Sequence, residues 1–220
     1  RVKQLLLKIA VLALVGCGEA EHEAAPMVQA EQEDLLTYED SEEAKAAVVI
    51  NAPPPERSLE VQFLDGELNG ADLEEVTKLD LDGYQLTELP KNLENLTQLK
   101  VLVLSKNQLT ELPNGLEKLT QLMSLNLRDN KLTNVKGLEK LTQLKGLNLS
   151  FNKLTGVKSL EKLTQLTFLQ LYSTRLTDVK VLEKLTKLAF LNLAGNPDLT
   201  KSQIDELKKA LPKCDIISDH

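Results

Sequence analysis

One arrangement of hydrophobic and polar positions recurs along the chain from residue 76 onward. It consists of an apolar residue, two variable residues, Leu, one variable residue, Leu, two variable residues, Asn, one variable residue and Leu; the copy at Leu99 reads LKVLVLSKNQL. The centre of each copy alternates apolar and polar residues, which predicts a short, half-buried strand. Successive copies begin 23, 23, 22, 22 and 22 residues apart, at residues 76, 99, 122, 144, 166 and 188.

Each copy also has a returning segment that completes its hydrophobic core. In the third copy we expect Leu125 and Leu127 to face inward, while Ser124 and Asn126 face outward. The apolar positions of residues 135–141 then form the opposite wall. Because no single copy can bury its own leucines, the copies must stack, with their strands parallel and about 4.8 Å apart.

Asn recurs where the chain turns away from each predicted strand. A buried amide at this place can bond backbone groups of adjacent turns that otherwise lack partners. We therefore interpret these residues as framework and not as a catalytic row. Tyr84 and Thr174 replace Asn in two copies, and we expect the network to be weakest there. The framework residues are Asn107, Asn130, Asn152 and Asn196.

This repeated text resembles the leucine-rich repeat family, whose repeats run 20–29 residues, over roughly residues 59–217. The resemblance implies an α/β solenoid shaped as a curved right-handed horseshoe, with parallel strands on the concave face and short helical or irregular segments on the convex face. The first two copies carry Leu-Pro, at residues 89–90 and 112–113, as in the Pro-bearing bacterial type. The next three carry Val-Lys instead and are similar to the repeats of bacterial internalins and the phosphatase-regulator branch of the family.

Both ends of the array carry sequences that we expect to cap it, because the last strand would otherwise expose an open edge. Residues 59–63 and 72–76 precede the first full copy, and residues 201–211 have the apolar spacing of a helix. The residues around Cys214 are typical of a terminal strand, in which Cys214 would be a small buried apolar side chain. We expect His220 to be disordered.

The first residues have the composition of a secretion signal. Three basic residues precede an apolar run at residues 9–15, which is too short for the roughly 20-residue helix that crosses a bilayer. Residues 14–17, Leu-Val-Gly-Cys, resemble the lipobox of bacterial lipoproteins. That resemblance implies cleavage before Cys17 and diacylation of Cys17. The alternative is an ordinary hydrophobic helix that ends in Gly-Cys.

The residue after Cys17 bears on location. By the same resemblance, Asp at this place holds many lipoproteins at the inner membrane, and the chain has Gly18 instead. We therefore expect a lipid-anchored protein of the cell envelope, at the outer membrane or cell surface, which meets the membrane only through its N-terminal lipid.

An acidic segment follows the lipobox. Residues 19–60 carry twelve acidic residues against two basic ones, and few large apolar side chains. Such a composition cannot offset the entropy lost on ordering, so we expect a flexible tether. A cation-binding tail is the alternative to a solvated spacer. The predicted organisation is a signal peptide at 1–16, lipidated Cys17 and tether at 17–57, and a repeat domain with terminal caps at 58–220.

Composition and charge disfavour several classes of function. The net charge of −7 at pH 7 argues against nucleic acid as a partner, since a phosphate-binding surface requires clustered Lys and Arg. Two Cys cannot form a disulfide-dense scaffold, and two His leave little for a metal or acid–base site. The sequence has no Gly-rich phosphate loop and no paired His at metal-ligand spacing. We therefore expect no enzymatic activity, no metal and no cofactor.

The outward positions of the strands predict a binding surface. Counted from the start of each copy, the third, fifth, seventh and eighth positions should point away from the core. Aromatic residues gather at these positions in the last three full copies, and amides line the fifth position. Apolar anchors rimmed by amides are typical of a protein-binding surface. The residues concerned are Phe151, Phe168, Tyr172, Phe190, Asn126, Asn148, Gln170 and Asn192, with Arg128 at the edge.

Two interpretations of this surface stay open. In the first, a monomeric, envelope-anchored module recognises a protein partner of unknown identity through the strand face. In the second, the aromatic residues only brace the sheet through cross-strand contacts, and the protein is a structural or scaffolding lipoprotein without a discrete ligand. An exposed apolar cluster would favour the first, and a smooth polar face the second.

Overall fold

The structure is a computed structural model that describes residues 58–220. The predicted signal peptide, the predicted lipidation site at Cys17 and the acidic tether therefore lie outside the described residues.

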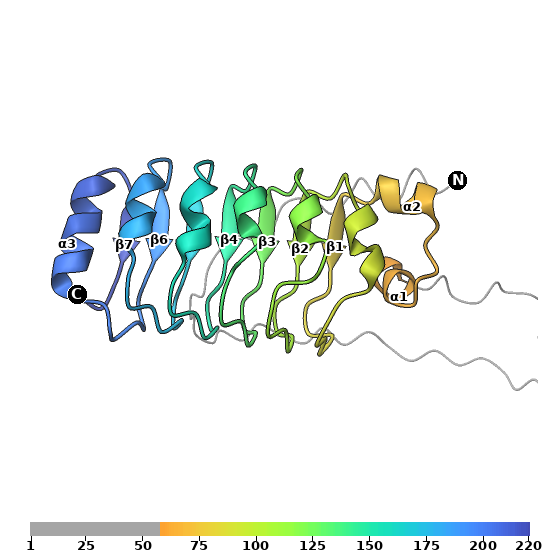
Figure 1. Ribbon diagram of the computed structural model, residues 1–220, viewed down its shortest axis with the longest axis horizontal. Helices are drawn as coiled ribbons and strands as arrows, with labels where there is room; N and C mark the ends of the chain where they lie inside the picture. Colours follow the sequence, from red (N-terminus) through yellow and green to blue (C-terminus); the bar gives the residue numbers. More distant parts are fainter. Residues whose placement is uncertain (1–57) are drawn as a thin grey trace, which may run out of the picture. The chain divides into compact units, whose positions relative to one another are not determined.

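Seven short strands form one parallel sheet in which sequence order and spatial order are the same (Figure 1). Neighbouring strands pair in strict repeat register, so that Leu102 lies beside Leu125 and Leu125 beside Leu147. A repeat spacing of 22 or 23 residues produces this register, because it returns each copy to the same place in the stack. The strands are β1 Lys78–Asp80, β2 Val101–Val103, β3 Ser124–Asn126, β4 Gly146–Asn148, β5 Phe168–Gln170, β6 Phe190–Asn192 and β7 Asp215–Ile217.

A second row of elements, made of short 3-10 helices, accompanies the strands along the array (Figure 1). Each helix forms in the returning half of a copy and packs against the helix of the next copy. The prediction of a leucine-rich repeat solenoid, with parallel strands and short helical return segments, is confirmed. The helices are η2 Lys91–Asn95, η3 Leu116–Lys118, η4 Leu138–Lys140, η5 Lys158–Lys162 and η6 Lys180–Lys184.

The core lies between the two rows and consists almost entirely of leucine. In the third copy, Leu125 and Leu127 from the strand side meet Val135, Leu138 and Leu141 from the returning side, and all five are buried. Each such side chain contributes about 1.5–3 kcal/mol by leaving water. The inward positions that the spacing predicts are therefore those that form the core.

Helices cover the N-terminal end of the array. The helices α1 Leu59–Leu64 and α2 Gly70–Glu75 precede the first strand, and Phe63 of α1 is fully buried against the core. Asn69 begins α2 by accepting hydrogen bonds from backbone N–H groups of the first turn, which satisfies donors that have no partner within the helix.

The C-terminal end is closed by α3 Lys201–Ala210 and the strand β7. Thr200 and Gln203 form a capping box at the start of α3, and Ile204 and Leu207 are buried against the last copy. The helix predicted at residues 201–211 is therefore confirmed.

Two expectations about the C-terminal residues are wrong. Cys214 is half-buried instead of buried, and loss of hydration, with a smaller effect of Asp215, raises the pKa of its thiol to about 11. His220 is described by the structure, and its Nε2 lies 2.8 Å from the carbonyl oxygen of Leu199. Short-range composition does not reveal a contact across twenty residues of a folded cap.

Candidate binding surface on the strand face

The outer side of the sheet is built from the first and third residues of each three-residue strand. The middle residue is a buried leucine and its two neighbours are half-buried in β2 to β6, because successive side chains of a strand point to opposite faces. Identical register then aligns these outward residues into columns across the sheet. Phe168 and Phe190 are neighbours in such a column, and their rings stack with centroids 4.9 Å apart and planes at 11°.

A second aromatic pair lies where the chain leaves the strands. The rings of Phe151 and Tyr172 meet edge to face with centroids 5.0 Å apart. The guanidinium carbon of Arg128 lies 4.9 Å from the centroid of the Phe151 ring, a cation–π contact. Phe151 and Tyr172 remain 40% and 37% exposed in spite of these contacts. We call Phe151, Phe168, Tyr172 and Phe190 the aromatic patch.

Phe151 occupies a backbone position that does not suit it. Its φ is +56°, in the left-handed region, which costs a bulky residue about 1–2 kcal/mol. The turn requires this conformation in every copy, and Gly occupies the corresponding place at residues 83 and 195. A large exposed ring at a strained position is not explained by the stability of the fold.

The amides of the fifth position have a role that sequence reasoning missed. The side-chain oxygens of Asn126, Asn148 and Asn192 each accept a hydrogen bond from the backbone N–H two residues later, at 3.0–3.1 Å. These local turns hold the chain as it leaves the strand. The NH₂ groups of Asn148 and Asn192 remain for a ligand, whereas that of Asn126 donates to Ser105 Oγ at 3.3 Å. Gln170 makes no such bond within residues 58–220, and its whole amide is free.

The seventh position does not point uniformly outward, which corrects our expectation. Ser105 and Ser150 are buried, because a small side chain at this place is covered by its neighbours. The Ser105 hydroxyl donates to Asp82 Oδ1 at 2.6 Å, and this bond, aided by Lys106, holds the pKa of Asp82 below its ordinary value. Ser150 Oγ instead accepts from the backbone N–H of Tyr172 at 3.3 Å.

The Asn residues behind the strands link consecutive copies. Asn152 Nδ2 donates to the carbonyl oxygens of Leu127 and Leu149, both at 2.9 Å, and its Oδ1 accepts from the N–H of Leu132 at 3.0 Å. Two of these three partners belong to the preceding copy, so one amide joins two turns. Equivalent donor bonds are made by Asn107, Asn130 and Asn196.

Thr174 occupies the same place with a shorter side chain. Its hydroxyl lies 2.9 Å from the carbonyl oxygen of Leu171 and 3.0 Å from Asn196 Oδ1, within its own and the following copy. The next residue, Arg175, takes a left-handed φ of +69°, as does Gln85 after Tyr84 with +59°. Both copies that lack Asn therefore turn differently.

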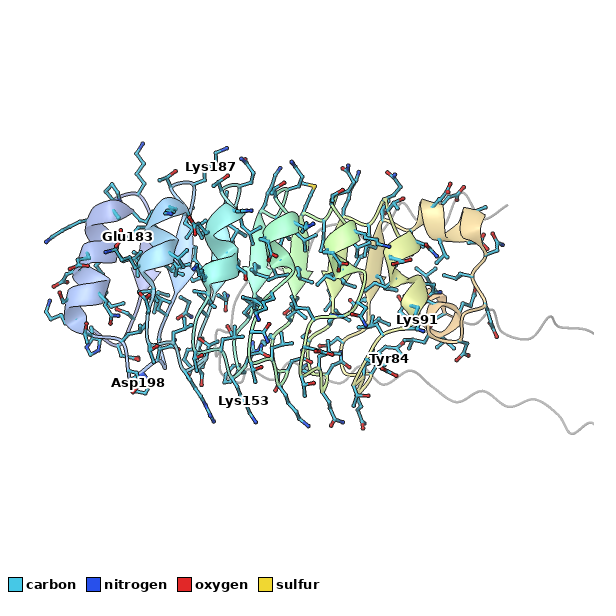
Figure 2. The ribbon with its side chains drawn as sticks, in the orientation of Figure 1. Tyr84, Lys91, Lys153, Glu183, Lys187 and Asp198 are labelled. Atoms are coloured by element: carbon cyan, nitrogen blue, oxygen red, sulfur yellow. The ribbon has the colours of Figure 1, made fainter. Side chains whose placement is uncertain are left out.

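A basic column at the tenth position was not identified from the sequence. Lys131 Nζ donates to Gln108 Oε1 at 3.0 Å, which shows that side chains at this position lie side by side in adjacent copies. Lys153 and Arg175 continue the column, and Figure 2 shows Lys153 projecting from the edge of the array opposite Lys187. The signal for this column was the recurrence of a basic residue after Asn or Thr in three consecutive copies.

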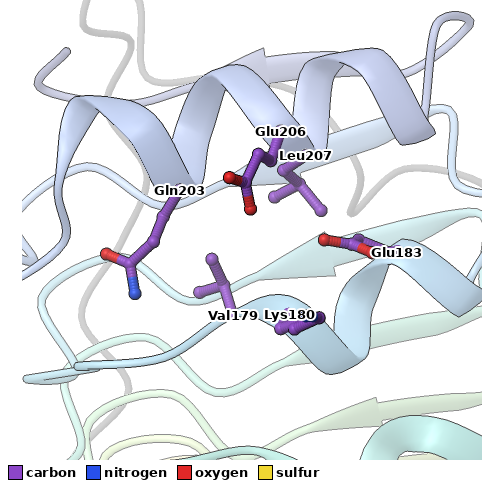
Figure 3. A pocket seen from close by; sticks show the side chains of 6 residues that line it. All are labelled: Val179, Lys180, Glu183, Gln203, Glu206 and Leu207. Carbon is purple, nitrogen blue, oxygen red and sulfur yellow. The ribbon is translucent and has the colours of Figure 1, made fainter.

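A small hollow separates α3 from η6 (Figure 3). Glu206 and Gln203 of α3 face Glu183 and Lys180 of η6 across it, over an apolar floor. Its volume of about 10 Å³ is at the lower limit for one water molecule. The hollow is a seam of the C-terminal cap and cannot hold a substrate.

A larger and more open hollow, of about 240 Å³, lies elsewhere on the C-terminal cap and is lined by Thr186, Leu188, Ala210, Leu211, Pro212, Lys213 and Cys214. Within residues 58–220, no group of three His, Cys, Asp or Glu side chains is placed to bind a metal ion. No helix in this range is both long and apolar enough to span a membrane.

A family model for the leucine-rich repeat region matches residues 69–216. Comparison with curated proteins finds no match. Among solved structures, a leucine-rich repeat protein of Leptospira interrogans is 37% identical, with a TM-score of 0.61, over 66% of this chain. The chain spans 38% of the length of that protein.

Two internalins of Listeria monocytogenes share the fold. The first is 23% identical with a TM-score of 0.55, over 69% of this chain and 50% of its own. The second, internalin C2, is 22% identical with a TM-score of 0.54, over 71% and 79%.

Proposed function

The chain belongs to the leucine-rich repeat family, and from this membership we propose that it is a protein-binding module that recognises its partner through the aromatic patch on the strand face. Arrays of this family are typically binding domains without catalytic activity, and their stacked strands offer an extended surface to another protein. The partner is a protein with an apolar surface that packs against the aromatic patch.

One observation carries this proposal: two exposed aromatic rings meet at the turns that follow β4 and β5, and a stacked pair of phenylalanines lies on β5 and β6. Exposed apolar clusters mark interaction sites in soluble proteins, and aromatic residues with Arg are the side chains most enriched among binding hot spots. The large ring of Phe151 supports the same interpretation, because the turn needs only a left-handed backbone at this place and Gly occupies it in two other copies.

The alternative of a scaffold without a ligand is less well supported. Bracing of the sheet accounts for Phe168 and Phe190, which are half-buried and stacked on each other. It does not account for Phe151 and Tyr172, which lie beyond the strand ends in the turns and keep more than a third of their surface exposed. Bracing therefore explains only half of the patch.

The proposal includes an anchor in the cell envelope. Cys17 would carry a lipid, and residues 18–57 would hold the repeat domain away from the membrane surface. Support for this step comes from the Leu-Val-Gly-Cys text at residues 14–17 and from the basic and apolar residues before it.

Capture from envelope extracts tests the binding function. The purified chain is used as bait beside the double variant Phe168→Ala, Phe190→Ala, and bound proteins are quantified by mass spectrometry. We expect the variant to lose the partner while its melting temperature stays within a few degrees. The matched control is Val101→Ala, Ser124→Ala, which changes the same column in the first half of the array and should retain the partner.

If the phenylalanine variant still captured the partner fully, the aromatic patch would not be the binding site. Equal loss in both double variants would show that the partner contacts the whole strand face and not the patch.

The anchor has its own test. The Cys17→Ser variant should escape acylation and processing, so that the protein moves from the detergent phase to the aqueous phase on partitioning. Unchanged mass and partitioning would contradict the lipobox interpretation without touching the binding function.

A further inference from the structure

The aromatic patch is bordered by basic side chains whose charges have no acidic partner within residues 58–220. Arg128 lies on the Phe151 ring, and Lys153 and Arg175 are exposed at the tenth position of the next two copies. Lys145 is exposed just before β4, and Lys131 bonds only the neutral amide of Gln108. None of these five side chains forms an ion pair with another residue of the described range.

The acidic side chains on the strand face of the first copy, in contrast, have partners within the protein. Asp82 receives the Ser105 hydroxyl and lies 3.1 Å from Lys106 Nζ. Asp80 lies 3.8 Å from Lys78 Nζ. These carboxylates already have partners on the protein, so the first half of the face is balanced in charge.

Two further carboxylates lie at the margins of the aromatic patch. Asp129 precedes Phe151 in the column of the eighth position, and Asp215 pairs in register with Phe190. A third, Asp219, accepts a hydrogen bond from the N–H of Gly195 in the copy that carries Phe190. Five basic groups against these three acids leave the surroundings of the patch positive, although the whole chain has a net charge of −7. A local positive field on an acidic protein attracts an acidic partner.

The position of the Arg128 guanidinium suits the binding of a carboxylate. This group lies over the Phe151 ring, which limits side-chain motion and leaves the N–H groups at its rim available. A planar fork of donors suits a carboxylate better than a single ammonium does, since it can bind both oxygens. Less conformational entropy is then lost when the partner binds.

We propose that the aromatic patch binds an acidic polypeptide segment that carries an aromatic or large aliphatic side chain. This inference rests on the proposed protein-binding function. The apolar side chain packs on the exposed rings of Phe151 and Tyr172. Neighbouring Asp or Glu residues reach Arg128, Lys153 and Arg175, and Gln170 bonds the backbone of the segment.

The dimensions of the sheet suit such a segment. The four strands β3 to β6 span about 14 Å at the usual separation of roughly 4.8 Å. An extended chain advances about 3.3 Å per residue, so roughly five residues cross from β3, which precedes Arg128, to β6, which carries Phe190. A short acidic motif can therefore meet the aromatic patch and its basic border together.

Binding of designed peptides to the full chain tests this chemistry by fluorescence anisotropy. One labelled peptide has Asp and Glu on both sides of a central Leu-Tyr pair. A second replaces the acidic residues by Lys and Arg, and a third replaces the Leu-Tyr pair by Ala-Ala. We expect the first peptide to bind at least about tenfold more tightly than either control, with affinity that falls as salt is added.

Variants locate the interaction. Arg128→Gln should weaken the acidic peptide about tenfold and reduce the salt dependence of its binding. Lys78→Gln removes a base that is already close to Asp80 on the same face, and it should change the affinity less than about twofold. Circular dichroism checks that both variants keep the fold.

Three results would overturn the proposal. These are equal binding of the acidic and basic peptides, an Arg128→Gln variant with unchanged affinity, and binding of an uncharged oligosaccharide such as chitotetraose in place of the peptides. If capture from extracts still depends on Phe168 and Phe190 in these cases, the protein-binding function stands and only the acidic chemistry fails. If capture does not depend on them, the binding function fails as well.

Discussion

The first three copies and the last three have the same interior and different exteriors. Strands β1 to β3 and β4 to β6 carry a buried leucine at every middle position, and their register is identical. The outward column changes completely between the two halves. It reads Lys78, Val101 and Ser124 in the first half and Gly146, Phe168 and Phe190 in the second.

This contrast separates what the fold requires from what it leaves free. Stacking fixes the leucines and the Asn residues, because each must meet its counterpart in the next copy. Nothing in the stacking requires an aromatic ring in the third position, since Val101 and Ser124 serve equally well there. The aromatic patch is therefore a property of the second half of the array and not of the architecture.

Leucine truncation gives the largest effect and tests whether the interior is shared. Leu102→Ala in the first half and Leu147→Ala in the second should each lower the free energy of unfolding by roughly 2–5 kcal/mol, since both side chains are at most 1% exposed. Lys145→Ala, at an exposed position beside β4, should cost less than about 0.5 kcal/mol. Urea denaturation measures all three.

A large loss for one leucine and a small loss for the other would break the comparison, because it would mean that the two halves do not share one core. A similar loss for Lys145→Ala and Leu147→Ala would reject the inward and outward assignment itself.

Replacement of the framework Asn has the next largest effect. Asn152→Ala leaves the carbonyl oxygen of Leu149 and the N–H of Leu132 without their side-chain partners in a buried region, which should cost roughly 2–4 kcal/mol. Thr174→Ala should cost only about 1 kcal/mol, because the carbonyl oxygen of Leu171 keeps its bond from Asn196 at 2.8 Å.

Thermal unfolding of the two variants, followed by circular dichroism, ranks these costs. An equal loss of stability would show that Thr174 carries as much of the network as Asn does. The weak point between the fourth and fifth copies would then not exist.

The sequence predicts the positions fixed by repetition and few of those fixed by a single neighbour. Spacing places the strands, the inward leucines and the C-terminal helix, because each of these recurs or has its own periodicity. It does not show that Asn126 turns its oxygen to the backbone of Arg128 or that Ser105 is buried. Those outcomes depend on side-chain geometry between copies, which no periodic signal encodes.

The same limit applies to the candidate site. Counting from the start of each copy places Phe168 beside Phe190, because strand register follows from repeat length. It does not place Arg128 over Phe151, since that contact arises in the turns after the strands, where the chain adopts left-handed conformations in residues other than Gly. Sequence alone therefore indicates the face and the structure supplies the contacts.

The smallest effect concerns the seventh position, where the two halves use the same residue differently. In the first half the Ser105 hydroxyl, with Lys106, lowers the pKa of Asp82. Ionised Asp82 then contributes stability at pH values above the ordinary Asp pKa of about 4, and that contribution is lost as the pH falls through the lowered pKa. Ser105→Ala should raise the pKa of Asp82 toward its ordinary value and make this loss of stability on acidification smaller.

Carbon-13 NMR titration of the Asp82 carboxyl measures the change directly, and Ser150→Ala is the matched control. Ser150 occupies the same position in the second half, but its hydroxyl oxygen accepts from the Tyr172 backbone and has no carboxylate partner within residues 58–220. The control should therefore leave the Asp82 pKa unchanged. If Ser105→Ala also left it unchanged, Lys106 alone would balance the charge of Asp82, and the hydroxyl would be a packing group in both halves.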